Sequence, residues 1–230
     1  MAEKVLRWAD PRYLETPQPS PISEIVRKLE TKGRVSVRYD KPLGHTHRGR
    51  KILGEFSFDP PTIFIDPESG RGSRFRFTLA HELGHLVLHG HLDLDFAALD
   101  EPTRSIRDGW PHFYFGRKRP ATDRHWLEWQ ANAFASGILV PKSTVTQAIA
   151  TKQMQLGINR RGYIYVDNQP QNRLDYDVLM KHLQSVYQAS RTMLRIRLNT
   201  LGILSDARDM QAHHIAQHIR SLFREDGEAN

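Results

Sequence analysis

The most regular hydrophobic pattern in the chain lies between residues 75 and 89. Four apolar side chains recur there at i, i+4, i+7 and i+8, the spacing of one face of an α-helix: Leu79, Leu83, Leu86 and Val87. No proline interrupts the segment. The pattern therefore predicts an α-helix over residues 75–89 that turns one apolar face to the core.

A second helix is predicted over residues 123–140, and Pro141 ends it. Small side chains are frequent in its second half: Ala131, Ala133, Ala135, Ser136 and Gly137. The distance between two packed helices depends on the side chains at their contact, and small ones let the backbones approach closely. We therefore expect another helix to pack tightly against this segment.

Shorter elements precede these two helices. The pattern predicts a helix over residues 24–32, followed by strands around residues 35–39, 54–58 and 62–65. Short strands close together in sequence favour a small antiparallel sheet. Four prolines within the first 21 residues predict an irregular N-terminal arm.

The C-terminal part is mostly helical in pattern. Helices are predicted over residues 142–155, 175–188 and 190–200, with a short strand within 162–167 and a loop at 168–172. The last two helices, joined by a tight turn, form a helix-turn-helix-like pair. These patterns divide the chain into an N-terminal arm (1–23), a main domain (24–150), a C-terminal helical segment (151–204) and a polar tail (205–230).

The composition narrows the chemistry that the chain can support. Its 230 residues include 12 histidines and no cysteine, which excludes disulfide bonds, thiol nucleophiles, iron–sulfur clusters and cysteine-ligated zinc. A metal site must therefore consist of imidazole and carboxylate groups. No stretch approaches the ~18 apolar residues that a membrane span needs, and the N-terminus lacks an apolar signal segment. We expect a cytoplasmic protein with no membrane contact.

The net charge of +7 is unevenly distributed, because the excess of Lys and Arg lies in residues 1–80 and 151–230. Basic flanks favour contact with nucleic acid or with an acidic protein. The alternative is an ordinary solvated surface, which we favour.

Residues 81–85, His-Glu-Leu-Gly-His, form an H-E-x-x-H motif inside the first predicted helix. Positions i and i+4 lie about 40° apart around a helix axis, so the His81 and His85 rings can bind one ion. Glu82 lies about 100° further round, where it can act on a water. In such a site zinc lowers the pKa of its bound water, and Glu82 as general base takes the proton and later returns it to the leaving amine.

A catalytic zinc usually has three protein ligands, and two residues compete for the third place. His91 stands at the distance of the third histidine in H-E-x-x-H-x-x-G-x-x-H, but Leu88 replaces the glycine that turns the chain in that pattern. Glu128 lies on the small-residue helix and shares a face with Asn132 at i, i+4. We favour Glu128 as the ligand, with Asn132 hydrogen-bonding a ligand imidazole.

Three segments together form a specific pattern: Arg76-Phe-Thr-Leu-Ala-His-Glu-Leu-Gly-His-Leu-Val-Leu-His89, Glu128-x-x-Ala-Asn132-x-Phe-Ala135 and Leu139-Val-Pro141. The pattern resembles the ImmA/IrrE family of zinc metallo-endopeptidases. The resemblance extends over roughly residues 24–204. Members often have Glu and Met where this chain has Gln130 and Val140. Neither difference removes a candidate ligand.

The resemblance implies an α+β fold with a zincin-like metalloprotease core: a small antiparallel sheet, the HExxH helix and a packed glutamate-bearing helix, followed by the helix-turn-helix-like segment. It implies Zn2+ bound by His81, His85 and Glu128, with Glu82 as general base. It also implies that the partner is a protein substrate, a helix-turn-helix repressor whose cleavage derepresses stress-response or mobile-element genes. Transcription regulation is therefore the expected role.

A competing interpretation is a DNA-binding transcriptional regulator whose zinc site is structural or vestigial. Arg191, Arg195 and Arg197 give the last predicted helix a cationic side suited to phosphate contact. Against it, Arg197 turns to another face than Arg191 and Arg195, so the three arginines do not form one continuous cationic side. Direct nucleic-acid binding is therefore not favoured.

Other histidines and aromatic residues have more than one interpretation. His89 and His91 follow the motif at the end of the predicted helix. A histidine there interacts favourably with the negative end of the helix dipole, so we expect both residues to cap the helix. The sequence does not choose among His112, Tyr114 and His125 as donors to a developing oxyanion. The aromatic run at 110–115 either lines a peptide groove or anchors the loop over residues 92–122, and we favour anchoring.

Overall fold

The computed structural model describes residues 1–46, 49, 51–90, 105–107 and 123–208, with backbone only for 105–107. The helices are α1 Ala2–Ala9, α2 Ile22–Thr31, α3 Ser73–His89, α4 Asp123–Leu139, α5 Lys142–Gln155, α6 Pro170–Tyr187 and α7 Arg191–Thr200, and the short 3-10 turns are η1 Pro11–Leu14 and η2 Pro67–Ser69. The strands are β1 Ser36–Arg38, β2 Gly54–Phe58, β3 Pro61–Ile65, β4 Ser105–Arg107, β5 Ile164–Val166 and β6 Leu204–Asp206. His91, most of the loop over 92–122 and the tail beyond residue 208 lie outside the described residues.

The main sheet has the strand order β1-β3-β2-β4. β2 and β3 form an antiparallel hairpin, and β2 also pairs antiparallel with β4. β1 runs parallel to β3, with Val37 opposite Ile63, so the prediction of a wholly antiparallel sheet was wrong. Strand alternation shows which face of a strand is buried but not the direction in which its neighbour runs. The long connection between β1 and β2 lets β1 pair with the far edge of the hairpin.

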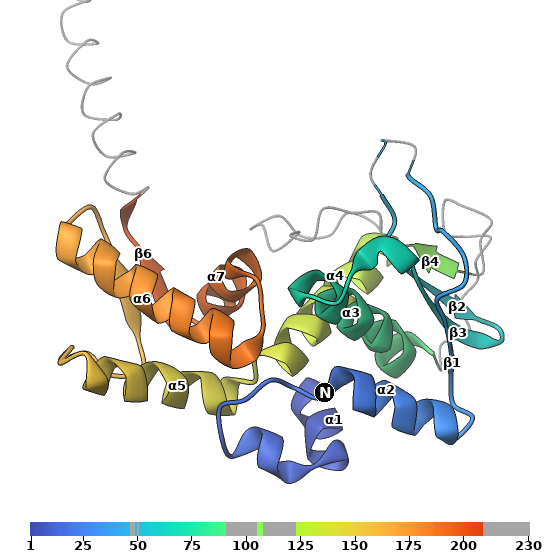
Figure 1. Cartoon of the computed structure of the whole chain (residues 1–230), viewed down its shortest axis with the longest axis horizontal. Coiled ribbons are helices and arrows are strands. Elements are labelled where there is room, and N and C mark those ends of the chain that lie inside the picture. The colour runs from blue at the N-terminus through green and yellow to red at the C-terminus, as the bar shows by residue number, and fades with distance from the viewer. Residues whose placement is uncertain (47–48, 50, 91–104, 108–122, 209–230) are drawn as a thin grey trace, which may run out of the picture.

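Helix α3 lies on this sheet and packs against α4 (Figure 1). Every residue from Phe77 to His85 is buried, because β2, β3, α2 and α4 all contact the helix. A Cβ atom added at Gly84 would lie 3.1 Å from the Ala131 Cα atom. The two helices therefore approach closely through small residues, as the composition of the second helix predicts.

The first 23 residues are not the irregular arm that their prolines predict. Residues 2–9 form α1, which packs against α4 and buries Leu6 completely. The first proline, Pro11, follows α1 and begins η1, where its missing N–H costs no hydrogen bond. Glu3 accepts a hydrogen bond from the Lys142 backbone N–H and so satisfies a donor at the start of α5.

The C-terminal part consists of α5, α6, α7 and a parallel pair of short strands, β5 and β6. α6 begins at Pro170, five residues earlier than predicted, because proline is well suited to the first helical position. The loop predicted at 168–172 is therefore partly helix, and strand β6 was not predicted. α7 packs against both α6 and α4, and the division at residue 150 stays a prediction. None of the described helices is long and apolar enough to cross a membrane.

Candidate metal centre

Two buried histidines of α3 lie close to Glu128 of α4. His81 and His85 are one helical turn apart, and each side chain is at most 1% exposed. Their Nε2 atoms lie 3.0 Å apart. The i, i+4 spacing in the motif therefore places two ring nitrogens at one point, as helix geometry requires.

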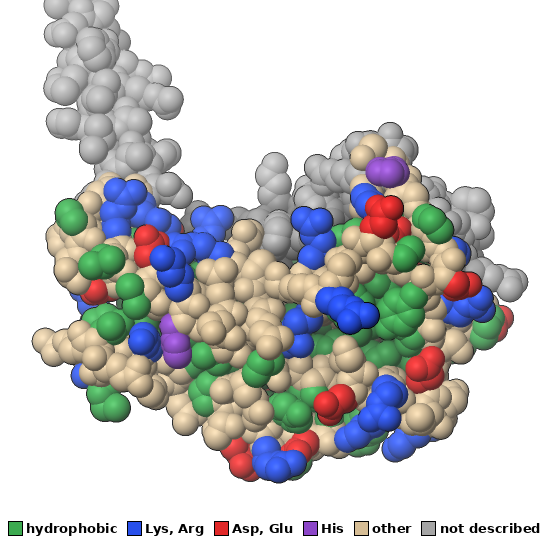
Figure 2. Space-filling model, viewed as in Figure 1, with side chains coloured by type: hydrophobic (Ala, Val, Ile, Leu, Met, Phe, Trp, Pro, Cys, Tyr) green, Lys and Arg blue, Asp and Glu red, His purple; other side chains and the backbone are tan. Residues whose placement is uncertain are grey.

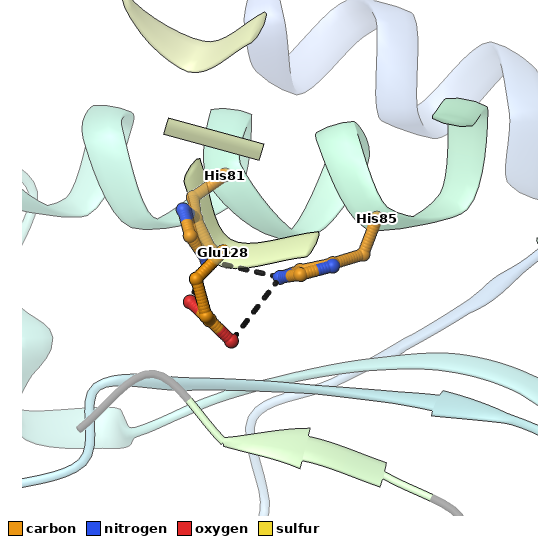
Figure 3. A group of neighbouring side chains, drawn as sticks. All are labelled: His81, His85 and Glu128. Atoms are coloured by element: carbon orange, nitrogen blue, oxygen red, sulfur yellow. Dashed lines mark hydrogen bonds and ion pairs between the residues drawn. The ribbon is translucent and has the colours of Figure 1, made fainter. Parts of the chain in front are cut away.

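Helix α4 brings the Glu128 carboxylate to the same point (Figure 3). Its Oε2 atom lies 3.2 Å from the His81 Nε2 atom, and its Oε1 atom lies 3.8 Å from the His85 Nε2 atom. The donor atoms of the three residues all lie within 4.8 Å of one another, and all three side chains are buried. The structure thus brings together the three residues predicted as metal ligands.

The surroundings of these three side chains fit a bound cation. Neither oxygen of Glu128 accepts a hydrogen bond from the described residues, although the carboxylate is buried. A buried carboxylate is costly unless a positive charge or hydrogen bonds compensate it. Burial, reinforced by His81, His89 and Arg124, lowers the pKa of the His85 imidazole well below its ordinary value, which favours the neutral ring that a metal ligand requires. Two imidazoles and one carboxylate form a donor set typical of catalytic zinc.

Asn132 holds the outer side of the first imidazole. Its Oδ1 atom lies 3.0 Å from the His81 Nδ1 atom, one turn beyond Glu128 on the same face of α4. Because an amide oxygen only accepts, His81 donates from Nδ1. The Nε2 atom of His81, which faces His85 and Glu128, then carries the lone pair that can bind a metal ion. The hydrogen bond expected of Asn132 is thus present in the structure.

The second imidazole has an outer partner that the sequence analysis missed. The His85 Nδ1 atom lies 3.0 Å from the His89 Nδ1 atom, and the His89 Nε2 atom lies 3.0 Å from the Gln130 Oε1 atom. His89 is the last residue of α3, as the capping interpretation expects, but it is also completely buried, and its two ring nitrogens contact His85 and Gln130. The spacing of His81, His85 and His89 at i, i+4 and i+8 is the signal that could have indicated a shared face.

Glu82, the candidate general base, lies completely buried on α3 beside the start of β2. A Cβ atom added at Gly54 would overlap the Glu82 Oε1 atom and would lie 2.6 Å from the Thr78 Cγ2 atom. Glycine at the first position of β2 therefore makes the room that this carboxylate occupies. Only the tertiary contact between α3 and β2 explains why residue 54 lacks a side chain.

The remaining candidates lie apart from this cluster. His125 is half-buried in the first turn of α4 and is not part of the three-residue group. His91, His112, Tyr114 and the aromatic run at 110–115 lie outside the described residues. Whether an oxyanion donor is among them stays a prediction.

A family model matches the first part of the chain. Residues 31–108 match the model described as Peptidase_M78, the IrrE N-terminal-like domain. The match includes the sheet and the whole of α3 with His81, Glu82 and His85, and it ends before α4. It confirms the resemblance read from the sequence motifs. No curated protein matches the chain.

Proposed function

Because residues 31–108 match the Peptidase_M78 model, we propose that the protein is a zinc-dependent endopeptidase of the HExxH…E type. The observation that carries the proposal is the buried convergence of His81, His85 and Glu128, whose donor atoms lie within 4.8 Å of one another. The family match indicates a metallopeptidase, and the donor set favours zinc among the metals that such a site takes.

Each polar group of the cluster has a separate task in this proposal. His81, His85 and Glu128 would hold zinc, which when bound lowers the pKa of a water and polarises a peptide carbonyl. Glu82, held beside Gly54, accepts the proton of the attacking water and returns it to the leaving amine. Asn132 holds His81 as the tautomer that ligates through Nε2.

The proposed substrate is a helix-turn-helix transcriptional repressor, and its cleavage would derepress stress-response or mobile-element genes. The support is the resemblance carried by the segments around His81 and Glu128. A regulatory peptidase must be selective, so we expect cleavage of one folded repressor and little hydrolysis of unstructured peptides.

The test is incubation of the protein with a repressor encoded beside its own gene, with zinc and with a chelator. We expect cleavage with zinc, none with chelator, and a loss of about 10²- to 10⁴-fold in Glu82→Gln. Glu24→Gln is the matched control, because Glu24 is exposed on α2 and distant in sequence from the motif. Cleavage that survives both chelation and Glu82→Gln would refute the proposed mechanism.

The DNA-binding alternative has less support from the arginines of α7. Arg191 forms an ion pair with Asp177, and the Arg197 Nε atom donates to the Val140 carbonyl oxygen 3.1 Å away. In the view of Figure 2, Lys and Arg are spread over both halves of the molecule, with Asp and Glu among them. A salt-dependent titration against specific and random duplexes tests the alternative, and a preference of ~10³ or more would favour it.

A further inference from the structure

A chain of three polar side chains runs outward from the second candidate ligand. His85 contacts His89 through their Nδ1 atoms, and His89 contacts the Gln130 amide through Nε2, each at 3.0 Å. The chain crosses from α3 to α4, and both histidines are completely buried. Gln130 is an exposed residue of α4, two positions after Glu128 in the chain.

With His89 neutral, the hydrogen bonds in this chain have one consistent direction. The Gln130 Oε1 atom is an acceptor, so the His89 Nε2 atom carries the proton of that bond. A neutral His89 then has a lone pair on Nδ1, and the facing His85 Nδ1 atom must donate. His85 is left with the lone pair of Nε2, the atom that faces His81 and Glu128.

We propose that His89 is a positioning residue, which together with Gln130 holds His85 in the ring orientation and tautomer that bind the metal. The inference rests on the metal site of the proposed function but not on peptide hydrolysis. Ligand histidines in metal sites commonly donate their outer N–H to a fixed acceptor, which orients the ring and raises the affinity for metal. In this chain a histidine takes the place of the usual carboxylate or carbonyl acceptor.

The arrangement around the first ligand supports this role. His81 and His85 each have their outer Nδ1 atom hydrogen-bonded, the first to Asn132 and the second to His89. In both cases the last acceptor is a side-chain amide of α4, Asn132 or Gln130. The two ligands of α3 are thus fixed by the same helix that supplies Glu128. A neutral amide at position 130 also adds no second negative charge beside the buried carboxylate.

The first experiment measures zinc affinity by chelator competition in full-length wild type, His89→Leu and His89→Asn. Leucine fills much of the space without an acceptor, whereas the Asn Oδ1 atom stands near the place of the histidine Nδ1 atom. We expect His89→Leu to weaken zinc binding about 10- to 100-fold and His89→Asn to stay within about threefold of wild type. Gln153→Leu is the matched control, since this buried glutamine lies on α5 and its side chain hydrogen-bonds the backbone of Gly162 and Tyr163.

The outcomes separate this inference from the proposed function. Unchanged zinc affinity in His89→Leu, or equal weakening in His89→Asn, would overturn the role of His89 and leave the metal site intact. Failure of the wild type to bind zinc would overturn both. If His89→Leu does not fold, Gln130→Leu replaces it, because residue 130 is exposed. We then expect a weakening of about 3- to 10-fold, and unchanged affinity would overturn the inference.

A second readout observes the tautomers directly. Long-range 1H–15N spectra of the zinc-loaded protein should show His85 protonated at Nδ1 and His89 protonated at Nε2. Comparison with the spectrum of His89→Asn identifies the His89 signals. A neutral His89 protonated at Nδ1 would reverse the direction of the chain and refute the proposal, whatever the affinities are.

Discussion

The α3–α4 pair and the C-terminal α6–α7 pair bury different kinds of side chain. The buried side chains of α3 and α4 include eight that are polar or ionisable: Thr78, His81, Glu82, His85, His89, Glu128, Asn132 and Ser136. The buried side chains of α6 and α7 are aliphatic or aromatic: Tyr176, Leu179, Met180, Leu183, Tyr187, Met193, Leu194 and Leu198. The charged side chains of this second pair are exposed or half-buried, and at the surface Arg191 forms an ion pair with Asp177.

The difference shows that the polar side chains of the candidate site lower the stability that burial gives to α3 and α4, whereas the apolar α6–α7 pair has no such loss. Burial of polar groups costs free energy unless each finds a partner, and sites that break local folding rules are commonly functional. Around α3 the cost is offset by close packing at Gly84 and by hydrogen bonds that His81 and His89 donate to the Asn132 and Gln130 side-chain oxygens. The apolar interior of the α6–α7 pair has no such cost. α7 also contacts the end of α4, where Arg197 donates a hydrogen bond to the Val140 carbonyl oxygen. We therefore expect substitutions in the two regions to separate metal affinity from stability.

The largest effect is expected at Glu128. Glu128→Ala should lower zinc affinity by ~10³ or more, because it removes one of the three proposed protein ligands. It should leave the metal-free protein equally or more stable, since it removes a carboxylate buried without hydrogen bonds from the described residues. Zinc content and urea unfolding of the apo protein measure the two effects. His91→Ala is the comparison, and loss of zinc there with retention in Glu128→Ala would reverse the ligand assignment.

The opposite result is expected in the C-terminal region. Leu183 is completely buried in α6, so Leu183→Ala should destabilise the protein by about 2–5 kcal/mol through lost burial and a residual cavity. Zinc affinity of the folded fraction should stay at the wild-type value, because α6 supplies no ligand. Urea unfolding and chelator competition test this. A fall in zinc affinity as large as that of a ligand variant would show that the two regions are not separable.

An intermediate effect is expected at the contact between α3 and α4. Alanine favours a helix by ~1 kcal/mol over glycine, yet Gly84→Ala should destabilise the protein by about 1–3 kcal/mol. The added Cβ would lie 3.1 Å from the Ala131 Cα atom and 3.2 Å from the Ala131 carbonyl oxygen, which pushes α4 and Glu128 away from the histidines. Zinc affinity should therefore fall together with stability. Gly72→Ala, where a Cβ meets nothing within 4 Å, is the control, and a stabilised Gly84→Ala would contradict the packing argument.

The smallest effect is expected at the surface of the C-terminal pair. Arg191→Gln breaks the ion pair with Asp177, whose side chains are 39% and 54% exposed, and exposed pairs contribute at most about 1 kcal/mol. Stability should change by less than that amount, and zinc affinity and cleavage should not change. A loss above ~2 kcal/mol in urea unfolding would show that α6 and α7 depend on this pair more than on their apolar contact.

The parts of the fold that the sequence predicts well are those with a local cause. The helices α3 and α4 begin and end within two residues of the prediction, because apolar spacing and Pro141 act within a few residues. The direction of β1 and the helix at residues 2–9 were missed. Strand direction depends on a partner far along the chain, and α1 is short enough that burial of Leu6 against the rest of the core contributes much of its stability.

The sequence by itself determined the chemistry of the candidate site. Without cysteine, a metal site had to use imidazole and carboxylate, and the helical repeat placed His81 and His85 on one face. Only the tertiary structure decided which distant groups meet them: Glu128 and Asn132 across the close approach at Gly84, Gln130 behind His89, and Gly54 beside Glu82. A helix specifies neighbours three and four residues apart, whereas contacts between residues more than 25 positions apart depend on the packing of whole elements.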